Sequence, residues 1–158
     1  MKEVLNVNKV SRFFVMMTCK LDFDLFGYCI FQACVARNPV INIATMATVT
    51  DIKDWTFNEA GLKFEYRSPT PDQMAEMYHK SPISHASKIK CPVYLMIGKE
   101  DLRVPPSQGL EFYHQLKGLG KDVDMNMYED NHPLGKVGNH ANCFINTVLF
   151  YKTILQKF

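Results

Sequence analysis

The sequence lacks an excess of charge of either sign. Its 18 lysines and arginines are interleaved with 16 aspartates and glutamates, so the formal net charge is only +2. Proteins that bind nucleic acid usually gather basic side chains on one face, and this balance gives no such footprint. We therefore expect a mixed, solvated surface and no nucleic-acid partner.

Long apolar runs are also missing. The run over residues 26–36 is interrupted by Gln32 and is shorter than the roughly 20 residues that a membrane-spanning helix needs. The run over residues 13–17 is too short for the core of a secretory signal, and Thr18 follows it directly. These features predict no membrane partner and no secretory leader.

No Cys-x-x-Cys pair occurs among the five cysteines, which stand at positions 19, 29, 34, 91 and 143. An odd number of cysteines without such pairs indicates free thiols rather than a disulfide framework. The sequence also holds no Asn-x-Ser/Thr glycosylation acceptor. A reducing, cytoplasmic location is the expectation.

What is present is the composition of one globular domain, with 47% hydrophobic and 22% charged residues over a length of 158. The continuous apolar run 92–98 predicts a strand buried on both faces of a parallel sheet. Alternation over 122–128 predicts a half-buried strand. Further elements are expected as a strand at 33–41, an irregular segment at 42–70, and helices at 73–80, 106–118 and 141–157. This order predicts an α/β fold, a parallel sheet flanked by helices.

Two details of these helices follow from local patterns. Asp72 is expected to cap the helix 73–80 at its amino end, because a short acidic side chain accepts hydrogen bonds from the first turn. The last helix is expected to bury its most apolar side chains against the rest of the domain. These are Phe144, Ile145, Val148, Leu149 and Leu155.

Asp101 and His132 each follow a predicted strand directly. The carboxyl ends of parallel strands meet at one edge of a sheet, so both side chains are expected at the same edge. A Ser-His-Asp site needs a carboxylate that orients an imidazole and an imidazole that takes the proton of a serine. The pair therefore predicts the acid and base of a serine hydrolase, in the chain order Ser, Asp, His.

Other interpretations of these residues stay open at this point. Asp101 could be a loop carboxylate that pairs with Arg103, and His132 could be an ordinary surface histidine. A small zinc site is a further alternative, although its spacing matches no standard finger. Its ligands would be Asp130, His132, His140 and Cys143.

From Ala33 onward the chain resembles the prolyl oligopeptidase family of serine peptidases, and within it the acylaminoacyl-peptidase (acylpeptide hydrolase) branch. The element Asp101-x-Arg103-Val104-Pro105 is typical of the wider family, and Ala-Arg-Asn-Pro-Val-Ile-Asn over 36–42 indicates the acylaminoacyl branch. Further matching stretches are 51–55, 75–77, 80–83 and 98–109.

The resemblance implies the C-terminal portion of an α/β-hydrolase fold, incomplete in this chain, over residues 33–158. It implies release of an N-acylated amino acid from a peptide, with His132 as general base and acid and Asp101 as its orienter. Arg103 would lie beside the site and bind substrate, or form a structural salt bridge. The family needs no metal or organic cofactor. Its members usually form homo-oligomers and carry an N-terminal β-propeller that selects substrates by size.

The first 32 residues do not match this family pattern. A Gly-x-Ser-x-Gly elbow is expected about twenty residues before Ala33, yet the sequence there includes only Ser11, which no glycine flanks. We therefore expect a fragment without its serine nucleophile, inactive alone. The alternative is a non-catalytic product that binds peptide or pairs with full-length subunits. The strand 33–41 would then expose an edge, unless residues 21–31 or another chain cover it.

Overall fold

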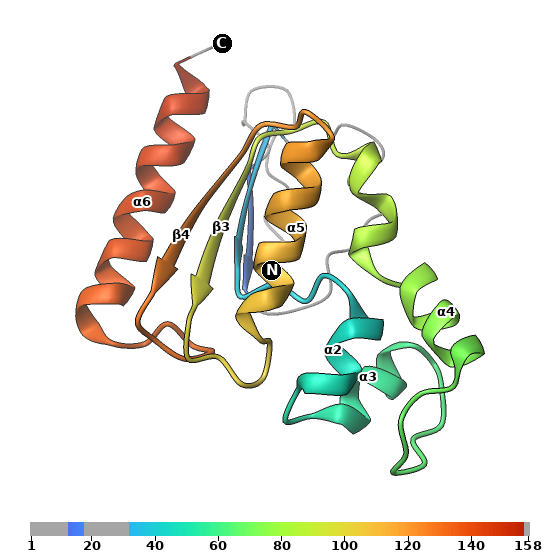
Figure 1. Cartoon of the computed structure of the whole chain (residues 1–158). Coiled ribbons are helices and arrows are strands. Elements are labelled where there is room, and N and C mark those ends of the chain that lie inside the picture. Colours follow the sequence, from blue (N-terminus) through green and yellow to red (C-terminus); the bar gives the residue numbers. More distant parts are fainter. Residues whose placement is uncertain (1–12, 18–31, 157–158) are drawn as a thin grey trace, which may run out of the picture.

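A four-stranded parallel sheet forms the centre of the molecule (Figure 1). The computed structural model describes the backbone of residues 13–17 and all of residues 32–156. The strands follow the order β1 (Phe13–Met17), β2 (Ala33–Arg37), β3 (Val93–Gly98) and β4 (Val123–Tyr128). All neighbouring strands pair in parallel, so their carboxyl ends lie at one edge of the sheet. The predicted α/β class and both later strands are confirmed.

The second strand differs from its prediction in length and in its neighbour. β2 ends at Arg37 rather than at residue 41, because Asn38 adopts a left-handed backbone conformation with φ of 42° and Pro39 follows. Its outer edge pairs with β1, so residues 13–17 cover it, while the predicted cover, residues 21–31, lies outside the described residues. The expectation of a bare edge beside β2 is therefore wrong.

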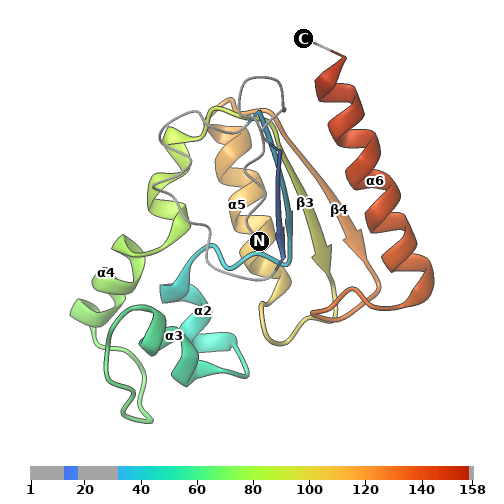
Figure 2. The ribbon, with the colours of Figure 1, turned by 180° about the vertical axis from the view of Figure 1, so that it is seen from behind.

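Helices cover both faces of the sheet. Alternate residues of β2 and β3 point to opposite faces, as strands require. On one face, Leu95 and Ile97 pack with Phe112 and Leu116 of α5 (Pro106–Gly118). On the other face, residues of both strands pack with Cys143 of α6 (Val137–Leu155). Figures 1 and 2 show α5 and α6 on opposite sides of the strands from both directions.

A cluster of short helices lies to one side, near the end where β3 and β4 finish (Figure 2). Its members are α2 (Ile43–Val49), α3 (Lys53–Glu59) and α4 (Pro71–His79). The 3₁₀ helix η1 (Pro82–Lys88) follows α4 and packs with α5 and the sheet instead. The prediction of an irregular segment over 42–70 is wrong for α2 and α3. Tertiary packing outweighs the weak helix propensity of a sequence rich in threonine and β-branched residues. The apolar side of α2 packs with Phe57 and Met77.

Two caps fix the boundaries of this cluster. Asn42 begins α2, and its side-chain oxygen accepts a hydrogen bond from the backbone N–H of Thr45. Thr70 rather than Asp72 caps α4, because it forms a reciprocal capping box with Gln73, and Pro71 occupies the first helical position. Asp72 instead lies in the first turn, where its charge favours the helix dipole.

The last helix presents a different face to the sheet from the one predicted. It begins at Val137, and its inward side includes Cys143, Phe150, Tyr151 and Ile154. The five side chains expected to be buried, at 144, 145, 148, 149 and 155, are exposed. The helix has two apolar stripes, and the stripe with the aromatic side chains, not the aliphatic one, meets Tyr94 and Tyr128. Among the described residues, no helix is long and apolar enough to span a bilayer.

Candidate active site

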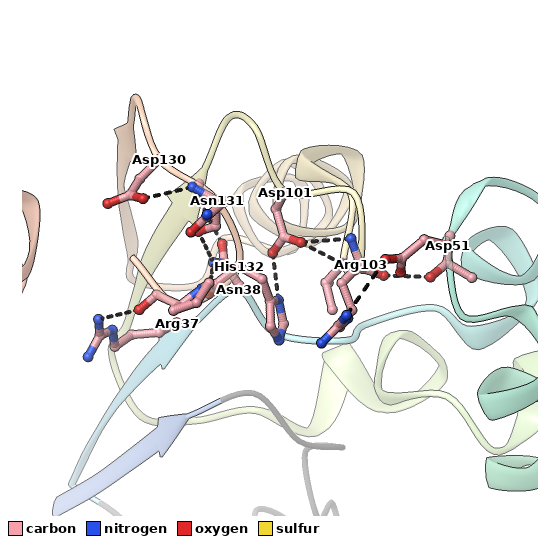
Figure 3. Close-up of polar contacts among 12 residues, drawn as sticks. Arg37, Asn38, Asp51, Asp101, Arg103, Asp130, Asn131 and His132 are labelled. Atoms are coloured by element: carbon pink, nitrogen blue, oxygen red, sulfur yellow. Dashed lines mark hydrogen bonds and ion pairs between the residues drawn. The ribbon is translucent and has the colours of Figure 1, made fainter. Parts of the chain in front are cut away.

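Asp101 and His132 form a hydrogen-bonded pair at the carboxyl edge of the sheet. Nδ1 of His132 lies 2.7 Å from Oδ2 of Asp101, across a separation of 31 residues in the chain (Figure 3). Because one strand–helix–strand unit connects them, the predicted placement on successive strand ends is confirmed. A carboxylate on Nδ1 holds the proton there and leaves Nε2 as the acceptor nitrogen.

The carboxylate of Asp101 is only 1% exposed, and its charge is balanced by donors from its own loop. Oδ1 accepts hydrogen bonds from the backbone N–H groups of Arg103 and Val104, each at 2.9 Å. A buried carboxylate without such donors would be strongly unfavourable. The loop therefore keeps Asp101 in place as an acceptor for the imidazole.

The histidine loop depends on a second buried carboxylate, Asp130. It accepts hydrogen bonds from the backbone N–H groups of Asn131 at 2.8 Å and Lys136 at 3.0 Å, and from Nδ2 of Asn139 at 3.1 Å. Burial alone would raise the pKa of Asp130, but these hydrogen bonds outweigh it and hold the pKa below its usual value. Asp130 thus closes the turn that carries His132.

Arg103 does not pair with the carboxylate of Asp101. Its guanidinium lies 3.8 Å from Oδ2 of Asp51, and its backbone carbonyl accepts a hydrogen bond of 2.6 Å from Oγ1 of Thr50. The link between α2 and α3 is thereby fastened to the loop after β3. The alternative in which Asp101 serves only as the ionic partner of Arg103 is wrong. The ionic neighbour of Arg103 is Asp51, and the role of Arg103 toward substrate stays a prediction.

These side chains surround an open cleft of about 320 Å³. The ring of His132 is accessible from it, since the side chain is 21% exposed. Both charges of the Arg103–Asp51 pair reach its lip, and no serine of the described segments lines it. The full lining consists of Asp51, Glu100, Asp101, Leu102, Arg103, Asn131, His132 and Pro133.

The residues of the alternative zinc site are not brought together. Cys143 is buried in the core under α6, whereas His132 points to Asp101. Within residues 13–17 and 32–156, no group of three or more histidine, cysteine or acidic side chains is arranged to hold a metal ion.

Two residues of the site were not predicted from the sequence. Asp51 stands 52 positions before Arg103 in the chain, and nothing in its neighbourhood indicates that the α2–α3 link reaches the cleft. Asn38 also contacts the histidine loop, from the end of β2. The one local signal was the Arg-Asn-Pro turn that ends the strand, since asparagine tolerates left-handed backbone.

Comparisons with known proteins agree with this arrangement. The sequence profile of the prolyl oligopeptidase family matches residues 28–157. The chain is 45% identical over 128 residues to the acylamino-acid-releasing enzyme of Mus musculus, and 40% identical over 124 residues to that of Arabidopsis thaliana. These matches cover 79% and 77% of this chain but only 17% and 16% of the relatives, so the chain spans about a sixth of their length.

Solved structures show the same fold. An acylaminoacyl peptidase in complex with Z-Gly-Gly-Phe-chloromethyl ketone superposes with a TM-score of 0.68 at 22% identity, over 90% of this chain and 24% of that one. The acylaminoacyl peptidase of Pyrococcus horikoshii, in its orthorhombic crystal form, superposes with a TM-score of 0.52 at 30% identity, over 65% of this chain and 16% of that one. The α/β-hydrolase fold predicted from the sequence, a parallel sheet flanked by helices, is confirmed. The boundary at residue 33 stays a prediction.

Proposed function

This chain belongs to the prolyl oligopeptidase family, and from that premise we propose that it carries the acid and base of a serine peptidase. The reaction is release of an N-acylated amino acid from the end of a peptide. The single observation that carries the proposal is the 2.7 Å contact between Nδ1 of His132 and the buried carboxylate of Asp101. The acylamino-acid-releasing enzymes that the chain is similar to supply the substrate class.

The proposed steps follow from the nitrogen that the pair leaves available. Nε2 of His132 takes the proton of a serine hydroxyl while the serine oxygen bonds to the carbonyl carbon of the acylated residue. The C–N bond then breaks, and His132 gives that proton to the departing amine. Water hydrolyses the resulting ester by the same route. Asp101 keeps the proton on Nδ1 and stabilises the imidazolium that forms in each step.

Arg103 is proposed as a substrate contact at the lip of the cleft. Its guanidinium is half exposed, and a planar fork of donors suits a peptide carbonyl or carboxylate oxygen. Asp51 lies 3.8 Å from that guanidinium and also lines the cleft. The N-acylated peptide would therefore lie in the cleft over His132, along the wall where the α2–α3 link is joined to the loop after β3.

We propose further that the nucleophile is not supplied by these 158 residues. The sequence contains no Gly-x-Ser-x-Gly motif, and no serine of the described residues reaches the cleft. Activity alone is then near zero, because the residual catalysis of triad mutants depends on an intact oxyanion hole and binding site. The same observation favours a second candidate, a non-catalytic product that binds peptide or pairs with full-length subunits.

A cytoplasmic location belongs to the same proposal. Cys34 and Cys143 are buried thiols outside any disulfide, which supports a reducing environment.

Two measurements test the proposal together. The purified chain is treated with a fluorophosphonate and weighed by intact mass spectrometry, and no adduct is expected. Residues 33–158 then replace the corresponding segment of the Mus musculus enzyme, and hydrolysis of an acetyl-alanine anilide is followed. The chimera is expected to be active, and to lose activity with His132→Ala but not with His114→Ala, an exposed histidine on α5.

Contrary results separate the parts of this proposal. A stoichiometric adduct on the isolated chain would mean that an activated nucleophile is present after all. A folded but inactive chimera would remove the peptidase assignment and leave the non-catalytic candidate. A normal burst of product from the His132→Ala chimera would refute the role of the base.

A further inference from the structure

Asn38 occupies a backbone conformation that few side chains adopt. It follows β2 directly, has φ of 42°, and is 1% exposed. Asparagine adopts the left-handed backbone conformation more readily than most non-glycine residues. Glycine would adopt it with less strain, so a buried asparagine at this position indicates that its side chain makes useful contacts. The contacts of Asn38 are therefore informative.

The side-chain amide of Asn38 bridges the ends of three strands. Its oxygen accepts a 2.7 Å hydrogen bond from the backbone N–H of Gly98, the last residue of β3. Its nitrogen donates to the backbone carbonyl of His132 at 2.7 Å, with a longer contact of 3.4 Å to that of Asn131. The backbone N–H of Asn38 donates to Met96 at 2.9 Å and so extends the pairing of β2 with β3. Figure 3 shows the amide between the two loops.

These contacts set the spacing of the acid and the base. Gly98 lies three residues before Asp101, so its amide group fixes where the acid loop begins. The carbonyl of His132 belongs to the residue whose ring must reach Asp101. We propose that Asn38 is a positioning residue that holds the backbone of His132 at the place from which Nδ1 meets Asp101. This inference deepens the proposed function and rests on it for its catalytic meaning.

An asparagine is required because only an amide side chain donates and accepts at the same time at this length. Aspartate would place carboxylate oxygens against the carbonyls of Asn131 and His132. An apolar side chain would leave the N–H of Gly98 and the carbonyl of His132 without this partner inside the protein. Glycine would suit the φ of 42° but would remove the bridge.

The isolated 158-residue chain is sufficient for the test. Histidine labelled with ¹⁵N reports by NMR which ring nitrogen of His132 carries the proton, and the signal is assigned by its loss in His132→Gln. In the unaltered chain we expect the Nδ1–H form. In Asn38→Gly the ratio of Nδ1–H to Nε2–H is expected to fall about tenfold, the loss typical of one hydrogen bond to a charged group.

Asn42→Gly is the matched control. Asn42 is also buried, with 4% of its surface exposed, and its side chain caps α2 and contacts Glu111 at 2.9 Å. It has no side-chain hydrogen bond to either loop of the cleft. It is expected to lower the melting temperature without changing the His132 spectrum. Asn38→Asp and Asn38→Ser are measured beside Asn38→Gly, so that at least one folded variant reports on the bridge.

An unchanged His132 spectrum in a folded Asn38 variant would overturn the inference. An equal change in Asn42→Gly would also overturn it, because the effect would then follow from lost stability in general. The spectrum needs no turnover, so this result is independent of whether the chimera hydrolyses peptide. In an active chimera, Asn38→Asp is expected to lower kcat at least tenfold with little change in KM, since the bound substrate is not touched.

Discussion

Gly98 and Asn131 lie so close together that a Cβ atom added to Gly98 would be 2.7 Å from the carbonyl oxygen of Asn131. The same atom would be 2.7 Å from the carbonyl of Asp130. The end of β3 and the histidine loop are therefore in direct backbone contact. Only glycine permits this approach, and the distance between the acid loop and the base loop depends on it.

Gly98→Ala is expected to lower the free energy of unfolding by about 1–3 kcal/mol, the usual range for overpacking a rigid site. Backbone atoms cannot move aside as a flexible side chain can, so the histidine loop must shift. Urea denaturation measures the loss. Gly138→Ala is the control, because nothing lies within 4 Å of its added Cβ and helix propensity favours alanine there. Equal effects of the two substitutions would contradict this account.

Asp101→Asn in the active chimera is expected to lower turnover by about 10⁴-fold, because an amide leaves the imidazole in the wrong tautomer. The initial rate of anilide hydrolysis measures it. Asp72→Asn is the matched control, since Asp72 is an exposed aspartate in the first turn of α4 and does not line the cleft. We expect that variant to keep its rate within about twofold. An unchanged rate in Asp101→Asn would remove Asp101 from its role.

Alkaline pH is expected to destabilise the fold. Burial raises the pKa of the Cys34 thiol far above its ordinary value of 9.0, and burial also raises the pKa of Tyr94, from 10.0 to about 12. Above pH 9 the unfolded chain loses protons that the folded chain keeps. The free energy of unfolding therefore falls as pH rises from 9, by up to about 1.4 kcal/mol per unit for each such group.

Denaturation curves at pH 7, 9 and 10 measure this dependence. In Cys34→Ala, the free energy of unfolding is expected to fall less between pH 9 and 10 than in the unaltered chain. Tyr94 is still present in this variant, so some fall is still expected above pH 10. The Cys34 thiol is also expected to resist alkylation at pH 8 until denaturant is added. A pH dependence identical in the variant and the unaltered chain would show that Cys34 does not contribute.

The orientation of α6 is testable with a pair of substitutions. Ile154 is 4% exposed and packs toward the sheet, whereas Phe144 is 68% exposed. Ile154→Ala is expected to lower the free energy of unfolding by about 2–4 kcal/mol. Phe144→Ala is expected to change it by no more than about 0.5 kcal/mol. Thermal or urea denaturation compares them. The opposite ranking would restore the face that the sequence pattern predicted.

The sequence alone was sufficient for the two later strands, β3 and β4, and for the acid–base pair, but not for β1. β3 is a short apolar run between proline and glycine, and β4 alternates, so each pattern is local. The meeting of Asp101 with His132 then follows from one topological rule about parallel strands. Both inferences need only residues that are near each other in the chain or at successive strand ends.

The other features of the fold and the site depend on contacts between residues far apart in the chain, which no local sequence pattern indicates. Asn38 acts on residues 60 and 94 positions away, and Asp51 reaches an arginine on another loop. The burial of α2 is decided by Phe57 and Met77, which supply the packing that its own propensity lacks. For α6, hydrophobicity could not choose between two apolar stripes, because the choice depends on which stripe fits Tyr94 and Tyr128.

The acid and the base of the cleft come from one uninterrupted β–α–β unit, β3–α5–β4. The turn that joins α5 to β4 lies at the end of the sheet opposite the cleft, where Gly120 has φ of 67° and Leu119 is exposed. Insertions or deletions there would alter the surface without moving either side chain. In evolutionary terms, residues 93–132 encode both functional groups within one short stretch of the gene, whereas the residue that bridges their two loops, Asn38, is encoded outside it.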